Sequence, residues 1–193
     1  QEVDYTGKAY KPKVVLTDEG KAKKAKYKVV YKNNKDAGTA SVVITGTGNC
    51  GGELAYDFTI KPLALNVDES AVKATSKVYN GGVNPAKITV KHINGKKKVG
   101  LKAGKDYDIE YEYVNAETGK KETTKEPTAV GTYTIKITGK GNYTGSTVIE
   151  SKSYTITPID IKKLKVTVKV NGTTPTVTVA IGKNVLSKTD YQM

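Results

Sequence analysis

Two stretches of the chain repeat one another without a gap, and this repetition constrains the fold more than any other feature of the sequence. Residues 37–52 read AGTASVVITGTGNCGG, and residues 130–145 read VGTYTIKITGKGNYTG. Strand-like residues follow both stretches and end at Pro62 and Pro158. A phosphate-binding loop would instead deliver its glycines to the start of a helix. We therefore predict that these glycines supply positive φ in a tight reversal between two strands.

The match extends in both directions and divides the chain into copies. An opening strand is expected at 5–16, 79–90 and 170–181, a tyrosine-rich strand at 26–31, 106–113 and 190–193, and a closing aromatic-Thr-Ile-x-Pro motif at 58–62 and 154–158. We predict a first copy at 1–63, a second copy at 64–160 and the truncated start of a third copy at 161–193.

The apolar residues of these segments alternate with polar ones, which is typical of β-strands with one wet face. In residues 106–113, four apolar residues share one face and four acidic residues share the other. No convincing helix is found, and residues 18–26 are predicted to form a polar loop. Short strands without helical crossovers indicate an all-β fold of tandem immunoglobulin-like antiparallel β-sandwich repeats.

The copies differ at their start and in one insertion. Residues 62–78 are predicted to hold the leading strand of the second copy, and residues 161–170 hold the same place before the third. The first copy lacks such a strand, which would leave its sheet an open edge. Residues 114–129 form a longer insertion than the matching residues 32–37. We expect a monomer and leave open an oligomer in which residues 162–193 pair with the open edge of another molecule.

The residues that usually carry catalysis are isolated here. Cys50 is the only cysteine and stands where the second copy has Tyr143, so it is interpreted as a small, half-buried apolar residue. The only histidine, His92, lies elsewhere on a lysine-flanked strand. No nucleophile elbow is present. We therefore predict no enzyme, no catalytic, cofactor-binding or metal-binding residue and no cofactor, and the ligand-binding residues are unknown.

An acidic ladder, consisting of Asp106, Asp108, Glu110 and Glu112, is the one candidate for a metal site. Alternate residues of a strand stand roughly 6.5–7 Å apart, which is too far for two neighbours to chelate one ion. We instead expect Lys87 and Lys91, on a neighbouring strand, to pair with these acids.

The basic residues narrow the choice of partners. All 32 are lysines, and the net charge is +13. Without arginine the chain lacks the bidentate fork with which nucleic-acid readers contact bases and phosphates, so we predict no nucleic-acid partner. The lysines indicate a solvated surface or a weak attraction to anionic polymers. No apolar run approaches the roughly 20 residues of a membrane span, so we expect no membrane insertion. The start at Gln1 suggests a processed or excised piece of a longer protein.

The combination of YTGKAYKP, GTASVVITGTGNCGG and FTIKP in the first copy with GTYTIKITGKGNYTG and YTITP in the second resembles the bacterial immunoglobulin-like and MBG-type repeats of Gram-positive surface proteins. The resemblance covers nearly the whole chain. It implies an extracellular location at the cell surface or cell wall and a non-catalytic stalk or adhesion role, with cell-wall or host glycans or proteins as partners.

Two alternatives remain open at this point. The first is a carbohydrate-binding, lectin-like module, for which Tyr10 and Tyr143 are the expected exposed aromatic platforms. The second is a Lys–Asn isopeptide bond that locks a domain covalently, for which the many lysines offer no single candidate.

Overall fold

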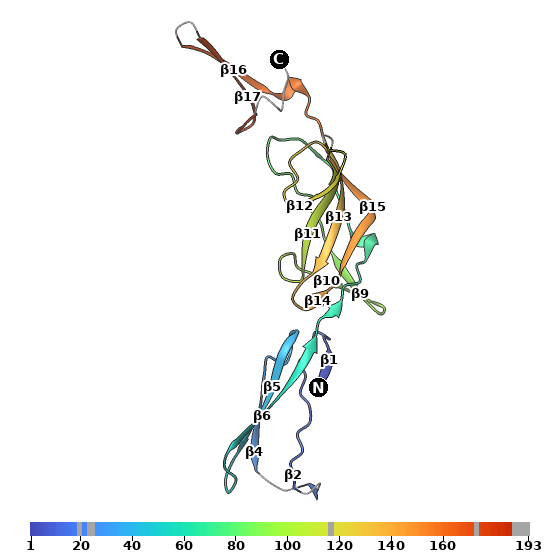
Figure 1. Ribbon diagram of the computed structural model, residues 1–193, viewed down its shortest axis with the longest axis vertical. Helices are drawn as coiled ribbons and strands as arrows, with labels where there is room; N and C mark the ends of the chain where they lie inside the picture. Colours follow the sequence, from blue (N-terminus) through green and yellow to red (C-terminus); the bar gives the residue numbers. More distant parts are fainter. Residues whose placement is uncertain (19–20, 23–25, 116–117, 172–173, 187–193) are drawn as a thin grey trace. The chain divides into compact units, whose positions relative to one another are not determined.

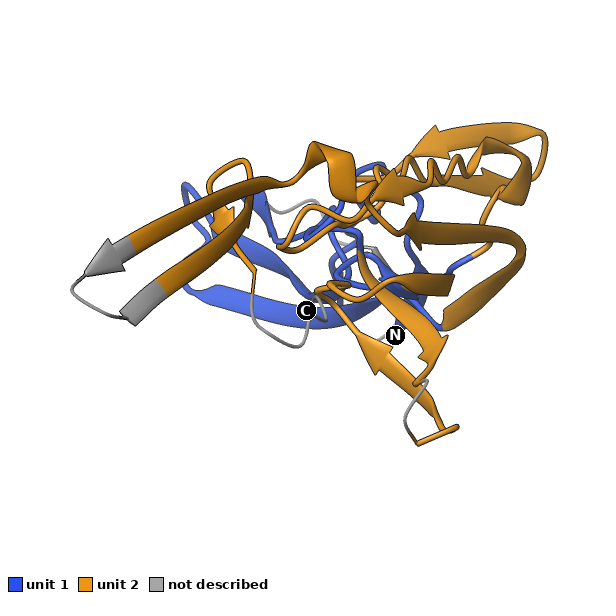
Figure 2. Cartoon of the chain, turned by 90° about the horizontal axis from the view of Figure 1, so that it is seen from above, with its two compact units in different colours: residues 1–65, 103–107, 138–145 blue, residues 66–102, 108–137, 146–193 orange. Residues whose placement is uncertain are grey.

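The computed structural model describes residues 1–18, 21–22, 26–115, 118–171 and 174–186. The described chain is all-β, with several sheets and two short 3₁₀ turns, η1 (Glu69–Ala71) and η2 (Ile161–Lys163) (Figure 1). Residues 1–65, 103–107 and 138–145 form one compact unit, and the remaining residues form the second (Figure 2).

The first unit is built on a four-stranded sheet in the order β1 (Glu2–Asp4), β6 (Glu53–Lys61), β5 (Gly38–Gly46) and β4 (Tyr27–Lys32). The last three strands are antiparallel neighbours, whereas β1 runs parallel to β6 and pairs with Thr59–Lys61 alone. The apolar residues of β5 form the buried centre of this sheet, with Ala40 and the consecutive Val42, Val43 and Ile44.

The reversal after β5 has the same backbone hydrogen bonds as the reversal after β13 (Gly131–Gly139). Gly46 N donates to Gly52 O at 3.0 Å, and Gly139 N donates to Gly145 O at 2.8 Å. Gly48 and Gly141 have φ values of 69° and 63°. A strand follows each reversal, so the prediction of a turn between strands is confirmed.

The second unit contains a five-stranded sheet in the order β12 (Lys121–Thr124), β11 (Tyr107–Val114), β13, β15 (Ser146–Thr157) and β8 (Lys77–Val78). Three tyrosines from neighbouring strands meet in its core, where the ring centroids of Tyr133 lie 6.3 Å from Tyr111 and 6.0 Å from Tyr154. All three rings are at most 3% exposed, as the alternation of these strands predicts.

Tyrosine hydroxyls tie the opening segment of each unit to its sheet. Tyr31 Oη donates to the carbonyl of Pro12 at 2.7 Å, and the Ala86 N–H donates to Tyr111 Oη at 3.0 Å. Tyr154 Oη donates in addition to the carbonyl of Asn84. These segments have few ladder bonds of their own, so the hydroxyls satisfy backbone groups that would otherwise lack partners.

One expectation about the second copy needs correction. Residues 62–78 do not form one leading strand but contain β7 (Leu63–Ala64), η1, β8 and a single bridge between Val67 and His92. The longer insertion noted at 114–129 contains a strand of its own, because its residues 121–124 form β12 and pair antiparallel with β11.

In the described chain, two antiparallel hairpins and one parallel pair make up three two-stranded sheets. The hairpins are β9 (Lys91–Asn94) with β10 (Lys97–Gly100) and β2 (Thr17–Asp18) with β3 (Lys21–Ala22), and β7 pairs in parallel with β14 (Tyr143–Thr144). The polar loop predicted at 18–26 lies partly outside the described residues.

The residues assigned to a third copy form a three-stranded sheet. Its order is β16 (Lys165–Asn171), β17 (Thr174–Ile181) and β18 (Asn184–Val185). The tyrosine strand expected at 190–193 lies outside the described residues.

Candidate functional site

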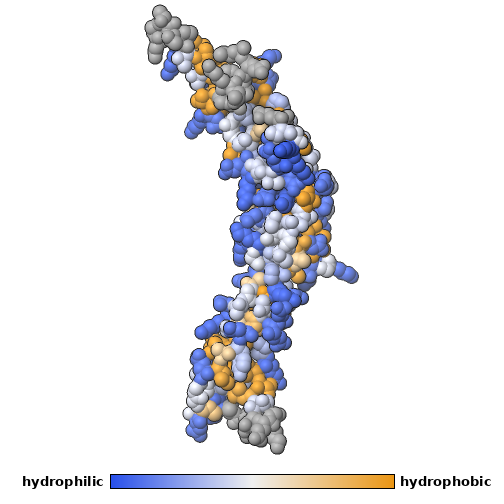
Figure 3. Space-filling model, viewed as in Figure 1, coloured by the Kyte–Doolittle hydropathy of each residue, from blue (hydrophilic) through white to orange (hydrophobic). Residues whose placement is uncertain are grey.

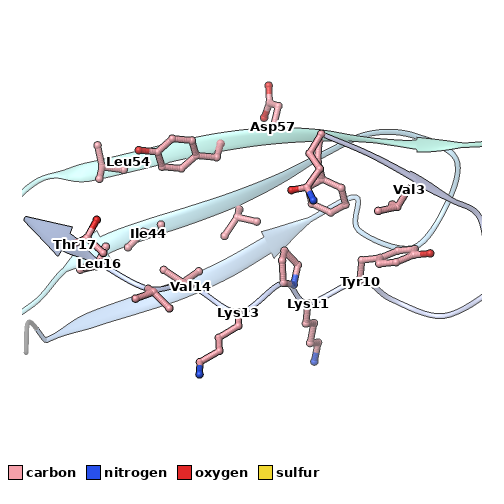
Figure 4. Close-up of a pocket in the computed structure, with 16 residues that line it drawn as sticks. Val3, Tyr10, Lys11, Lys13, Val14, Leu16, Thr17, Ile44, Leu54 and Asp57 are labelled. Carbon is pink, nitrogen blue, oxygen red and sulfur yellow. The ribbon is translucent and has the colours of Figure 1, made fainter. Parts of the chain in front are cut away.

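A groove in the first unit is the strongest candidate for a binding site. It has a volume of about 780 Å³ and lies between the irregular segment 10–17 and the strands β5 and β6 (Figure 4). Its lining is mixed and comes entirely from the first unit: Gln1, Val3, Tyr10, Lys11, Pro12, Lys13, Val14, Val15, Leu16, Thr17, Val42, Ile44, Leu54, Tyr56, Asp57 and Phe58. We call it the β6 groove.

The β6 strand leaves large apolar side chains open to solvent in this groove. Leu54 is 52% exposed and Tyr56 is 60% exposed. They lie on the same face of β6 because strand residues two apart share a face. The space-filling view shows apolar side chains gathered over the first unit (Figure 3). Exposed apolar surface of this kind marks interaction sites more often than scattered single residues do.

The polar groups of the β6 groove are already engaged or turned outward. Asp57 accepts a hydrogen bond from Ser41 Oγ at 2.6 Å, and Tyr10 Oη donates to the carbonyl of Asp4 at 2.6 Å. Lys11 and Lys13 point away from the strands (Figure 4). This arrangement suits the binding of an extended apolar segment better than acid–base chemistry, which needs opposed titratable groups.

The two aromatic residues expected to be exposed are not the ones that the structure exposes. Tyr143 is only 7% exposed and packs edge-on against Tyr5, with ring centroids 5.9 Å apart. Burial raises the pKa of its hydroxyl. Tyr10 is half-buried against Phe58. Tyr56 was missed. The alternation of Leu54, Tyr56 and Phe58 places it with them on one face of a strand but does not show that this face is open to solvent.

The acidic ladder forms ion pairs, but with different lysines from those predicted. Glu112 pairs with Lys121 at 2.7 Å, and Glu110 pairs with Lys136 at 3.6 Å. The prediction that Lys87 and Lys91 lie on a strand next to the ladder was wrong, because the neighbours of β11 are β12 and β13. Across the described residues, no group of three or more histidine, cysteine, aspartate or glutamate side chains lies close enough to hold a metal ion.

Cys50 and His92 each contribute to the local structure around them. Cys50 is half-buried in the turn between β5 and β6, as predicted. His92 lies on β9 and is 3% exposed, and its Nδ1 accepts a hydrogen bond from the Asn66 N–H at 3.1 Å. Burial lowers the pKa of this imidazole. The neutral imidazole ring therefore holds the segment before η1 against β9.

A buried carboxylate lies close to the same segment. Asp68 is 5% exposed, and Lys98 Nζ contacts its Oδ2 at 2.7 Å while Ser70 Oγ donates to its Oδ1 at 2.6 Å. The hydrogen bonds from Lys98 and Ser70 lower the pKa of Asp68. Lys98 is about half exposed, with 52% of its side chain accessible, so this contact is an ordinary ion pair between a β-hairpin and the segment it covers.

No protein-family model matches the chain, and no curated protein matches it. Within the part of the chain that the structure describes, no helix has the length and apolar character to cross a membrane.

Proposed function

We propose that this chain is a non-catalytic stalk or presentation module of an extracellular bacterial surface protein, built from immunoglobulin-like β-repeats in series. Its location would be the cell surface or cell wall of a Gram-positive cell. In each unit, the strand that enters the main sheet and the strand that leaves it pair in parallel. This pairing is the observation that carries the proposal.

In the first unit, β1 enters the sheet and β6 leaves it, and the two run parallel. Tension along the chain would pull β1 backward and β6 forward. Parallel neighbours then slide past one another, so their hydrogen bonds are loaded together in shear. Antiparallel end strands would be pulled apart at one end and would open one bond at a time.

The second unit has the same arrangement at β8 and β15, which are also parallel. The hydrogen bond that follows each pair is equivalent, from Tyr5 N to Lys61 O at 2.9 Å and from Tyr79 N to Thr157 O at 2.8 Å. A stalk must resist tension. The recurrence of the parallel strand pair in both units supports a serial arrangement of similar modules. The resemblance of the sequence motifs to MBG-type repeats points in the same direction.

Single-molecule pulling between handles fused to both ends of the chain tests the proposal. We expect two unfolding events that release about 200 Å and about 280 Å of chain, for residues 2–61 and 77–157 at roughly 3.5 Å per residue. Substituting Val3→Pro removes a backbone N–H from β1 and should lower the force of the shorter event only.

Val3→Ala is the matched control, because it shortens the same side chain and keeps the N–H. We expect its unfolding force to remain close to that of the unsubstituted chain. If both units unfold at forces no higher than an unzipped hairpin, or if Val3→Pro leaves the force unchanged, a stalk role based on these strand pairs is wrong.

The proposed location has its own test. An antibody against the chain should label intact, unpermeabilised cells of the organism that produces it, and external protease should remove the label. Labelling that appears only after permeabilisation would contradict a surface location.

Carbohydrate binding is the second candidate, and the exposure of Tyr56 is the observation that favours it. An open tyrosine ring can stack on a sugar face. A glycan array should then show specific binding that Tyr56→Ala abolishes and Tyr143→Phe retains. If no glycan on the array binds, carbohydrate binding is wrong and the stalk role is the one that remains.

A further inference from the structure

The β6 strand has an unprotected outer edge. β1 covers this edge at Thr59–Lys61, and among the described residues no strand is hydrogen-bonded to it at 53–58. Natural proteins usually protect such edges with lysine, proline or a covering segment. The stretch 53–58, which reads ELAYDF, contains neither lysine nor proline. Its backbone groups are therefore available to an added strand.

In the second unit the matching edge is covered by the chain itself. Ser151 Oγ of β15 donates to Glu69 Oε2 at 2.9 Å, and Thr155 N donates to Ser76 Oγ at 3.2 Å. Residues 69–76 thus run beside β15. Ile149, four residues after the turn, is fully buried there, whereas Tyr56, four residues after the matching turn, is 60% exposed.

The chain also carries a strand with the properties of the missing neighbour. β16 pairs on one side with β17, and its other side is an edge of the sheet. Val166 and Val168 are each 58% exposed on one face of β16. Lys165 and Lys169 lie on the opposite face and are exposed to solvent.

The two edges complement one another residue by residue. Leu54 and Tyr56 lie two apart on one face of β6, as Val166 and Val168 do on β16. Glu53 and Asp57 lie four apart on the other face, as Lys165 and Lys169 do. An antiparallel register that places Thr167 opposite Ala55 brings both apolar pairs and both opposite-charge pairs together.

We propose that β16 of one molecule adds to the outer edge of β6 in a second molecule, at residues 53–58, and covers the β6 groove with its valine face. The contact is heterologous, so each molecule offers one donor strand and one acceptor edge, and successive molecules join head to tail. This inference does not depend on the proposed stalk role.

The other edge of the same sheet is a poorer acceptor. β4 presents two exposed lysines, Lys28 and Lys32, which lie four residues apart on one face. These would face Lys165 and Lys169 of an added β16, and like charges directly opposite are destabilising. The β6 edge instead offers carboxylates to the same lysines.

Sedimentation equilibrium of the whole chain tests the proposal. We expect a mass that rises with concentration beyond that of a dimer. Val168→Lys on the donor and Tyr56→Lys on the acceptor should each leave a monomer. Both side chains are more than half exposed, so both variants should fold. Val114→Lys is the matched control, since Val114 is 66% exposed at the end of β11, and it should associate like the unsubstituted chain.

Mixing the two defective variants separates this contact from unspecific association. The Val168→Lys chain retains its β6 edge, and the Tyr56→Lys chain retains its β16 strand. An equimolar mixture should therefore form dimers of one molecule of each and nothing larger. A monomer in the mixture, or in the unsubstituted chain at millimolar concentration, would overturn the proposal.

Disulfide trapping tests the register. In a Cys50→Ser background, a chain with Ala55→Cys and a chain with Thr167→Cys should form a mixed disulfide dimer in either strand direction. Lys28→Cys in place of Ala55→Cys is the control on β4 and should not cross-link. Three results would each assign the groove to a different occupant. The first is trapping through Lys28→Cys, and the second is binding of a glycan that competes with association. The third is an intramolecular disulfide when both cysteines are on one chain.

Discussion

At the scale of single residues, the glycines that first suggested a phosphate loop are required by close backbone packing. A Cβ on Gly46 would lie 2.7 Å from the carbonyl oxygen of Cys50, and one on Gly139 would lie 2.8 Å from the nitrogen of Thr144. Backbone atoms cannot rotate away as a side chain can. The two matching turns therefore exclude any larger residue at the same position.

We predict that Gly46→Ala destabilises the first unit by about 1–3 kcal/mol, because the new methyl group forces the turn apart. Gly51→Ala, in the same turn, is the control. No atom of the described part of the chain lies within 4 Å of its added Cβ, so the stability of this variant should change by less than about 1 kcal/mol. Urea denaturation measures both, and equal effects of the two substitutions would contradict this account of the turn.

We also predict that the second unit loses stability as the pH falls below about 6.5, the pKa of an unfolded histidine. The pKa of His92 is lowered by burial, so the unfolded chain binds the proton more readily than the folded one. Melting temperatures between pH 7.5 and pH 5 should fall in the unsubstituted chain.

The variant His92→Asn should show a flatter profile over that range, because the amide oxygen can accept the hydrogen bond from Asn66 without titrating. Asp68, whose pKa is lowered, gives stability that is lost only at more acidic pH. A profile as steep in His92→Asn as in the unsubstituted chain would show that another group is responsible.

At the scale of elements, the insertion at 114–129 widens the sheet of the second unit by one strand. Glu122 of β12 accepts hydrogen bonds from Tyr113 Oη at 2.9 Å and from Asn115 Nδ2 at 3.0 Å. These bonds join β12 to β11 and to the segment that connects the two strands. Among the described residues of the first unit, no strand covers the matching edge at β4, whereas β12 covers it here.

We predict that Glu122→Ala destabilises the second unit by about 1–3 kcal/mol, since two hydrogen bonds to a charged acceptor are lost. Glu126→Ala is the control in the same segment, because its side chain is exposed, and it should change stability by less than about 0.5 kcal/mol. Hydrogen exchange should accelerate in residues 121–124 of the first variant. Unchanged protection there would mean that packing, rather than these bonds, holds β12.

At the scale of the whole molecule, the surplus of lysines governs weak association with charged polymers. The net charge is +13, with 32 lysines against 19 acidic residues. Such a surface attracts polyanions over a Debye length of about 10 Å at 0.1 M salt and about 3 Å at 1 M. This attraction is unspecific and needs no built site.

We predict that the chain is retained on a sulfated polysaccharide column at low salt and elutes well below 1 M sodium chloride, because screening removes the attraction. Tyr56→Ala should elute at the same salt concentration, which separates charge from stacking. Retention that survives 1 M salt would instead indicate a specific glycan site.

Much of the fold could be predicted because its signals are local. Alternation identified the tyrosine-rich strand, and the glycine pattern identified the two reversals, since both depend on residues close in sequence. The pairing partners could not be predicted in this way. Glu112 meets Lys121 because the insertion folds back as β12, which alternation in residues 106–113 does not reveal.

The candidate site was harder to predict than the strands. Tyr143 was expected to be exposed because it lies in a glycine-rich turn, yet Tyr5 packs against it from the other end of the sequence. Tyr56 was overlooked because alternation alone cannot say whether a face is covered. Burial depends on which distant segment reaches a strand, and that is a property of the packed chain.

The sequence by itself determined that the chain is β-rich, where its strands reverse and that Cys50 serves a turn, because backbone conformation follows from neighbouring residues. Only the tertiary structure decided which strands are parallel, where the β6 groove opens and that no strand of the described residues covers 53–58. Those features arise from contacts between segments far apart along the chain, whose pairing is selected by packing as a whole.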